Sequence, residues 1–126
     1  MHELSIAMQL VDVAARAAED AGAERVSVVR LRLGALSGVV RDALEFSFAI
    51  VAADTALAGA QLQIEELPLV IYCVPCARKA TLVGISSFRC PSCNTPSGDI
   101  RQGRELEIVG LEIMGAGVAQ QQPLHP

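Results

Sequence analysis

The chain has 126 residues, a length that suits one domain or one domain with a small satellite. Hydrophobic residues make up 52% of the sequence but aromatic residues only 3%, so the predicted core consists of Leu, Val, Ile and Ala. The net charge of −4 and the pI of about 5.1 argue against a nucleic-acid-binding protein, because such proteins usually carry a basic face.

The sequence has no feature of export or membrane insertion. No positive charge precedes an apolar run at the N-terminus, and no apolar stretch reaches the roughly 18 residues of a membrane span. We therefore predict a cytoplasmic protein without membrane contact. In that compartment paired cysteines are more often metal ligands or redox groups than disulfides.

The spacing of polar and apolar residues predicts helices over residues 3–21 and 41–53 and strands over residues 25–33, 60–67 and 104–114. In the first helix, polar residues recur every three or four positions. The opposite, buried stripe is predicted to contain Ile6, Leu10, Val13 and Ala17.

The order of these elements predicts an α+β fold, in which a three-stranded sheet packs with two helices and carries an inserted, zinc-ribbon-like module of four cysteines. We expect residues 1–69 and 97–114 to form a discontinuous α/β domain. Residues 70–96 form the zinc-binding module, which is too short to fold without a staple. Residues 115–126 form a flexible tail, in which His125 is a solvated residue.

The cysteine module contains two Cys-x-x-Cys pairs, Cys73 with Cys76 and Cys90 with Cys93, separated by thirteen residues. Each pair can form a tight knuckle in which both thiolates point at one centre. Two knuckles supply the four tetrahedral sulfur ligands that Zn²⁺ prefers. The pattern therefore predicts a structural zinc site, and a site closed by four sulfurs leaves no open position for catalysis.

Other interpretations of the module stay open. Iron can take the same four ligands, and a Cys-x-x-Cys pair can also serve redox chemistry. Arg78, Lys79 and Arg89 give the module a positive charge, which indicates either a solvated face or a contact with an acidic partner. The alternative function is that of a zinc ribbon that binds nucleic acid or the transcription machinery, although the acidic balance and the few aromatics count against it.

The N-terminus offers a second set of metal donors. The α-amine of Met1, the amide nitrogens of His2 and Glu3, and the His2 imidazole can converge on one ion. Nitrogen-rich, near-planar sets of this kind suit Ni(II) or Cu(II). A histidine at the second position is nevertheless an ordinary surface residue in most proteins.

Several motifs together resemble those of one family. They are the opening Met1-His2-Glu3-Leu4-Ser5-Ile6-Ala7, the turn from Leu33 to Val39, the two cysteine pairs, and the last strand with Gly103-Arg104-Glu105-Leu106 and Leu111-Glu112-Ile113. Over residues 1–114 the chain resembles the HypA/HybF family of hydrogenase-maturation nickel metallochaperones.

The resemblance implies a carrier, not an enzyme. It implies Ni²⁺ as the transferred cargo, with His2 as the nickel ligand and Met1 and Glu3 in support, and Zn²⁺ as the structural ion on the four cysteines. Some relatives have a further acidic ligand at the start of the second helix. The stretch here reads Val40-Arg41-Asp42, which departs from that pattern, so Asp42 is not assigned.

The resemblance also implies partners. We expect a nickel-binding GTPase of the maturation pathway and the hydrogenase large subunit, with urease as the target enzyme in some organisms. A homodimer is a further expected assembly, and nucleic acid is not an expected partner.

Overall fold

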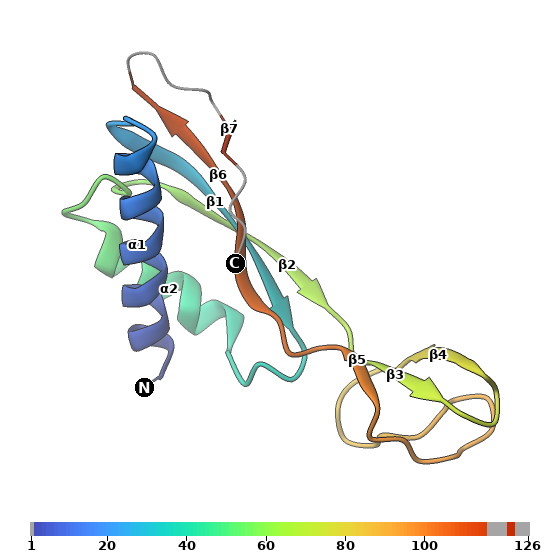
Figure 1. Ribbon diagram of the computed structural model, residues 1–126. Coiled ribbons are helices and arrows are strands. Elements are labelled where there is room, and N and C mark those ends of the chain that lie inside the picture. The colour runs from blue at the N-terminus through green and yellow to red at the C-terminus, as the bar shows by residue number, and fades with distance from the viewer. Residues whose placement is uncertain (1, 116–120, 123–126) are drawn as a thin grey trace. The chain divides into compact units, whose positions relative to one another are not determined.

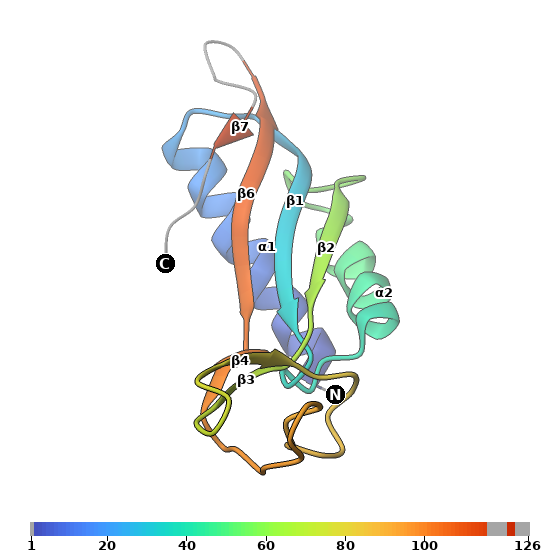
Figure 2. The same ribbon diagram turned by 90° about the vertical axis from the view of Figure 1, so that its right-hand side faces the viewer.

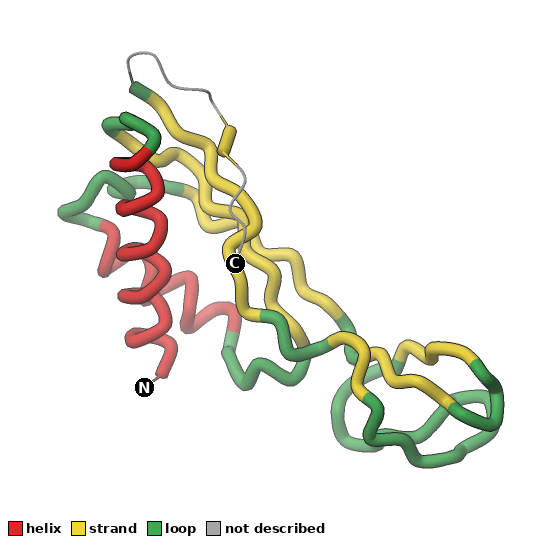
Figure 3. The backbone as a smooth tube through the Cα atoms, in the orientation of Figure 1, coloured by secondary structure: helices red, strands yellow, loops and turns green. Residues whose placement is uncertain are grey.

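The computed structural model describes residues 2–115 and 121–122 of the chain. It is an α+β fold with two helices and two β-sheets (Figures 1 and 3), which confirms the predicted fold class. The predicted helices and strands agree with the observed ones to within two residues at each end. The elements in chain order are α1 (His2–Asp20), β1 (Arg25–Gly34), α2 (Arg41–Ala52), β2 (Gln61–Leu67), β3 (Val70–Cys73), β4 (Arg78–Thr81), β5 (Ile100–Gln102), β6 (Leu106–Met114) and β7 (Gln121–Gln122).

The chain divides into two compact units. The first comprises Met1–Leu31, Val39–Ile64 and Glu107–Pro126, and the second comprises Arg32–Gly38 and Glu65–Leu106. The domain division made from the sequence stays a prediction. Strand β5 lies just beyond the predicted end of the cysteine module at residue 96 and pairs with β3.

The larger sheet has the strand order β2-β1-β6-β7, and in the first unit α1 and α2 lie on the same face of it (Figure 2). Strand β7 pairs antiparallel with β6, with Leu111 opposite Gln122. The sequence analysis did not predict this strand, because it placed residues 115–126 in a flexible tail. The rest of that tail from residue 116 onward, including His125, lies outside the described residues.

Helix α1 is amphipathic and ends as the sequence predicts. Gly22 has a φ of 76°, and the N–H of Ala23 donates to the carbonyl of Ala18, which is the hydrogen bond of a Schellman cap. The predicted buried stripe is wrong in part, because Val13 is 49% exposed. Neither helix in the described part of the chain has the length and apolar character needed to cross a bilayer.

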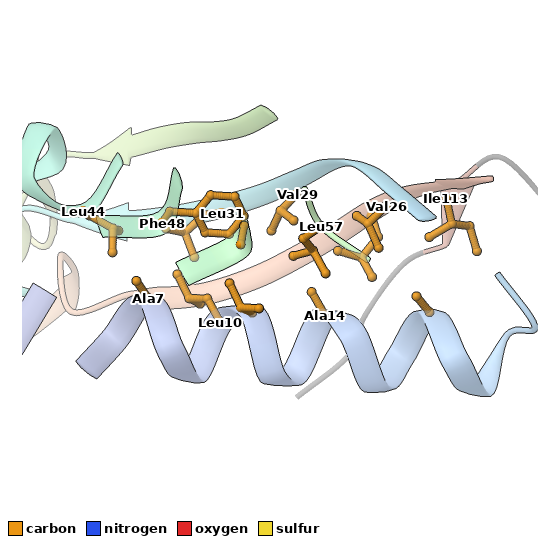
Figure 4. Close-up of a cluster of buried hydrophobic side chains, with 14 residues drawn as sticks. Ala7, Leu10, Ala14, Val26, Val29, Leu31, Leu44, Phe48, Leu57 and Ile113 are labelled. Atoms are coloured by element: carbon orange, nitrogen blue, oxygen red, sulfur yellow. The ribbon is translucent and has the colours of Figure 1, made fainter. Parts of the chain in front are cut away.

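The core of the first unit lies between the helices and the sheet (Figure 4). Small residues of α1, Ala7, Ala14 and Ala18, face the sheet and are almost fully buried. They meet larger side chains of the strands, of α2 and of the loop after it. Those labelled in Figure 4 are Val26, Val29, Leu31, Leu44, Phe48, Leu57 and Ile113.

The second unit has a small core. Its sheet has the order β4-β3-β5, and Leu69, Ile71 and Leu82 form its buried cluster. Much of the segment around these short strands is loop (Figure 3). So small a cluster buries little apolar surface, so this unit needs another source of stability.

Candidate metal sites

The first cysteine pair lies in the turn of the β3–β4 hairpin. Strand β3 ends at Cys73, which pairs with Arg78 at the start of β4. The N–H of Ala77 donates to the carbonyl of Val74 at 3.0 Å, and Ala77 has a left-handed φ of 53°. The hairpin register thereby places Cys73 and Cys76 on a tight turn.

The second cysteine pair lies in a loop closed by its own backbone. The N–H of Cys90 donates to the carbonyl of Thr95 at 2.9 Å, and the N–H of Asn94 donates to the carbonyl of Cys90 at 2.8 Å. Asn94 has a left-handed φ of 63°. The same local geometry therefore follows both cysteine pairs, at Ala77 and at Asn94.

The four thiols meet at one point. Their sulfur atoms all lie within 4.8 Å of one another, with 3.4 Å between Cys73 and Cys93 and 3.9 Å between Cys76 and Cys90. All four cysteines are free thiols. A tetrahedral zinc ion with sulfur at about 2.3 Å would separate its ligands by about 3.8 Å. The cluster therefore fits a metal ion of this size and geometry.

Exposure differs between the ligands. Cys73 and Cys90 are buried, Cys76 is half-buried and Cys93 is exposed. Each knuckle therefore has one protected sulfur and one more accessible sulfur.

The surroundings of the second knuckle favour the ionised sulfur that a metal requires. The hydroxyl of Thr95 lies 3.2 Å from Cys93 Sγ and, with the Thr95 backbone N–H, lowers the pKa of Cys93 to about 6. The backbone N–H groups of Cys93 and Ser92 lower the pKa of Cys90. The neighbouring thiols of Cys93 and Cys73 raise the pKa of Cys76 to about 12.

The N-terminal residues form a second arrangement, in the first unit. His2 Nε2 lies 3.2 Å from the Glu3 carboxylate, and the backbone N–H of Val40 donates to the same carboxylate oxygen at 3.2 Å. The Val40 contact is the main cause that lowers the pKa of Glu3. The Glu3 side chain is only 13% exposed, whereas His2 is 59% exposed.

Val40 is the N-cap of α2 and makes no side-chain cap of its own. An unpaired N–H at this position is usually satisfied by a glutamate in the first turn of the same helix. Here a glutamate from α1 takes that place. Glu3 therefore connects the start of α1 to the start of α2.

Two further residues named in the sequence analysis are Asp42 and Met1. Asp42 lies in the first turn of α2 and is exposed. Met1 lies outside the described residues. Thr95 and the Glu3–Val40 contact were missed by the sequence analysis. A hydroxyl two residues after a cysteine ligand is a signal that could have identified Thr95.

Comparison with known sequences gives one consistent family. Residues 1–113 match the model of the family described as hydrogenase/urease nickel incorporation, metallochaperone, HypA. The hydrogenase maturation factor HypA of Chloroflexus aurantiacus is 57% identical over 112 residues, which are 89% of this chain and 98% of that protein. The protein of the same name from Roseiflexus sp. is 53% identical over 112 residues, which are 89% of this chain and 91% of that protein. The one from Streptomyces avermitilis is 42% identical over 112 residues, which are 88% of this chain and 86% of that protein.

Two solution structures have a similar fold. The Ni metallochaperone HypA from Helicobacter pylori superposes with a TM-score of 0.62 at 18% identity, over 89% of this chain and 97% of that chain. A second solution structure, of a HypA protein, gives a TM-score of 0.66 at 21% identity, over 90% of this chain and 97% of that chain. At such identities the likeness concerns the fold alone.

Proposed function

The chain belongs to the HypA family of hydrogenase/urease nickel-incorporation metallochaperones, and from this membership we propose that it binds Ni(II) at its N-terminus and delivers the ion during maturation of nickel–iron hydrogenase. The family consists of maturation factors, not of catalytic enzymes. We assign Zn²⁺ to Cys73, Cys76, Cys90 and Cys93 as a structural ion. The closeness of the four sulfurs, which lie within 4.8 Å of one another, and the small core of the second unit support this assignment.

The observation that carries the nickel proposal is the contact between His2 and Glu3. A histidine that ligates a metal usually directs its other ring nitrogen at a carboxylate, which fixes the tautomer. Glu3 faces Nε2, and we assign Nδ1 as the nitrogen that ligates the ion. With the Met1 amine and the amide nitrogens of His2 and Glu3, it forms a donor set that suits Ni(II).

Delivery requires that the ion can leave. His2 is 59% exposed, so an ion that it binds can reach the ligands of a partner. Release passes Ni(II) to a partner in the cytoplasm. We propose that the partners are a nickel-binding GTPase of the maturation pathway and the hydrogenase large subunit. Urease is a second proposed target enzyme, and the proposed assembly of this chain is a homodimer.

Metal analysis of the untagged chain tests the proposal. After incubation with nickel and zinc together, we expect the wild type to retain one ion of each. His2→Ala loses nickel and keeps zinc, whereas His125→Ala, which removes the other histidine, keeps both. Nickel retained by His2→Ala contradicts the site.

Two further measurements use the same assay. A residue added before Met1 is expected to weaken nickel binding, because the free amine then lies one residue farther from His2. Chain-end amines and imidazoles ordinarily titrate between about pH 6 and pH 8, so nickel affinity is expected to fall steeply across that range as protons compete. A flat affinity from pH 8 to pH 6 contradicts amine and imidazole ligation.

A further inference from the structure

Two arginine side chains donate hydrogen bonds to the second cysteine knuckle. Arg78 lies two residues after Cys76, and its Nη2 donates to Ser92 Oγ, inside the second knuckle, at 3.1 Å. Arg89 directly precedes Cys90, and its Nη1 donates to the carbonyl of Asn94 at 3.1 Å. One guanidinium therefore connects the two knuckles and the other closes the second one.

Other contacts also constrain the second knuckle, because Arg89 and Pro96 form a β-bridge beside it and the Thr95 hydroxyl lies 3.2 Å from Cys93 Sγ. Two backbone hydrogen bonds within residues 90–95 close its loop. Its outer ligand, Cys93, is exposed. The buried cluster of this unit contains only Leu69, Ile71 and Leu82, none of which belongs to the loop. The two arginine contacts add side-chain hydrogen bonds to these constraints.

The charges near the cluster also support a role for the arginines. Four thiolates around a divalent cation carry a net charge of −2, which is costly to place away from water without nearby positive groups. Between Cys73 and Cys93 the chain has Arg78, Lys79 and Arg89 and no acidic residue. The Lys79 side chain, unlike the arginines, makes no hydrogen bond or ion pair to the knuckles as far as the chain is described.

We propose that Arg78 and Arg89 are positioning residues for the metal on the four cysteines, which hold the second knuckle in its ligating geometry and offset the thiolate charge. The inference rests on the proposed zinc site. Loss of either guanidinium lets the second knuckle open, so Cys93 and then Cys90 release the ion sooner. Lys79 contributes the same charge without the contacts.

Zinc release from the full chain tests this proposal. Wild type, Arg78→Gln, Arg89→Gln, the double variant and Lys79→Gln are loaded with one zinc ion and mixed with excess chromophoric chelator at neutral pH. We expect each arginine variant to release zinc at least about threefold faster than wild type, an effect near the upper part of the range for exposed contacts of charged groups. The double variant is expected to be faster than either, and Lys79→Gln to stay within about twofold of wild type by the same scale.

A spectroscopic measurement separates positioning from general stability. With Co(II) in place of zinc, the thiolate-to-cobalt absorption bands are expected to shift in Arg78→Gln and Arg89→Gln but not in Lys79→Gln, because only the arginines orient the ligands. Thermal unfolding of the first unit is expected to be the same in all variants.

Three results would overturn either the arginine proposal or the zinc assignment. Arginine variants that match wild type in release rate and spectrum overturn the proposal. Arginine variants that release zinc no faster than Lys79→Gln also overturn it, because net charge would then be sufficient. A wild type that retains no zinc overturns the zinc assignment under the proposed function instead.

Discussion

The residue that follows each cysteine pair has a left-handed backbone. Ala77 has a φ of 53° and Asn94 a φ of 63°. This conformation costs a residue with a Cβ atom about 1–2 kcal/mol, and asparagine tolerates it better than alanine does. Ala77 is therefore the strained residue of the pair, and the β3–β4 hairpin maintains that strain.

Replacing Ala77 by glycine is expected to relieve the strain. We expect Ala77→Gly to stabilise the zinc-bound module by about 0.5–1 kcal/mol, after allowance for the greater freedom of glycine in the unfolded chain. Competition with a chelator measures the change as tighter zinc retention. Asn94→Gly is the matched variant and is expected to change retention less. Weaker retention in Ala77→Gly would show that the unfolded-state entropy dominates.

Glu3 predicts a pH-dependent contribution to stability. Its pKa is lowered from the ordinary value of 4.5 by the Val40 contact, so the stabilisation is complete above about pH 4.5 and is lost as the pH falls through the lowered pKa. Glu3→Gln keeps an acceptor for the Val40 N–H but does not titrate. We expect the thermal midpoint of wild type to fall more than that of Glu3→Gln between pH 7 and pH 3. If the thermal midpoints of the two proteins fall equally with pH, the negative charge of Glu3 contributes nothing to the Val40 contact.

At the scale of elements, the last residue of β1 is constrained by a close backbone contact. A Cβ atom on Gly34 would lie 2.2 Å from the Gly103 carbonyl oxygen and 2.6 Å from Glu105 Oε1. The N–H of Gly34 also donates to the carbonyl of Glu105, and the N–H of Leu36 donates to the carbonyl of Gly103. The turn after β1 and the segment before β6 therefore fit together only with glycine at position 34.

Gly34→Ala is expected to lower the free energy of unfolding by about 1–3 kcal/mol, the usual cost of forcing atoms into filled space. Gly110→Ala is the matched control, because a Cβ on Gly110, which is in β6, meets nothing within 4 Å. Its expected effect is within about 0.5 kcal/mol. Urea unfolding of both variants measures the difference. Equal losses in the two variants would contradict the contact.

The sequence predicted the elements better than it predicted which sides they bury. Periodicity located both helices and the three long strands, because those segments repeat clearly. In α1, apolar residues cover more than one face, so periodicity could not choose between Val13, which is exposed, and Ala14, which is buried. Alanine lets the helix approach the sheet closely, and that distance is a tertiary property.

The same division applies to the candidate sites. Cysteine spacing alone indicated the four ligands that meet in the structure. The contacts Arg78–Ser92, Arg89–Asn94 and Glu3–Val40 connect residues through folded geometry. Local sequence carries no signal for such contacts. Sequence therefore gave the donor atoms, and the structure adds the groups that orient them.

At the scale of the whole molecule, the two units differ in what holds them together. The first unit buries a cluster of fourteen apolar residues between helices and sheet. The second buries a cluster of three and has the four cysteines beside it. A structural metal contributes folding free energy directly, and a small unit depends on it more than a large one. The stability of the two units should therefore respond differently to metal removal.

Chelation of zinc is expected to unfold the sheet β4-β3-β5 while the core of the first unit stays folded. Amide hydrogen exchange on the full chain, with and without chelator, measures this residue by residue. Amides of Ile71 and Tyr72 are expected to lose protection, whereas amides in α1 such as those of Leu10 and Ala14 keep it, because their burial does not involve the cysteines. Cys73→Ala is expected to reproduce the chelated pattern without any chelator. If chelation exposes both units equally, they fold as one cooperative unit and the zinc ion stabilises the whole chain.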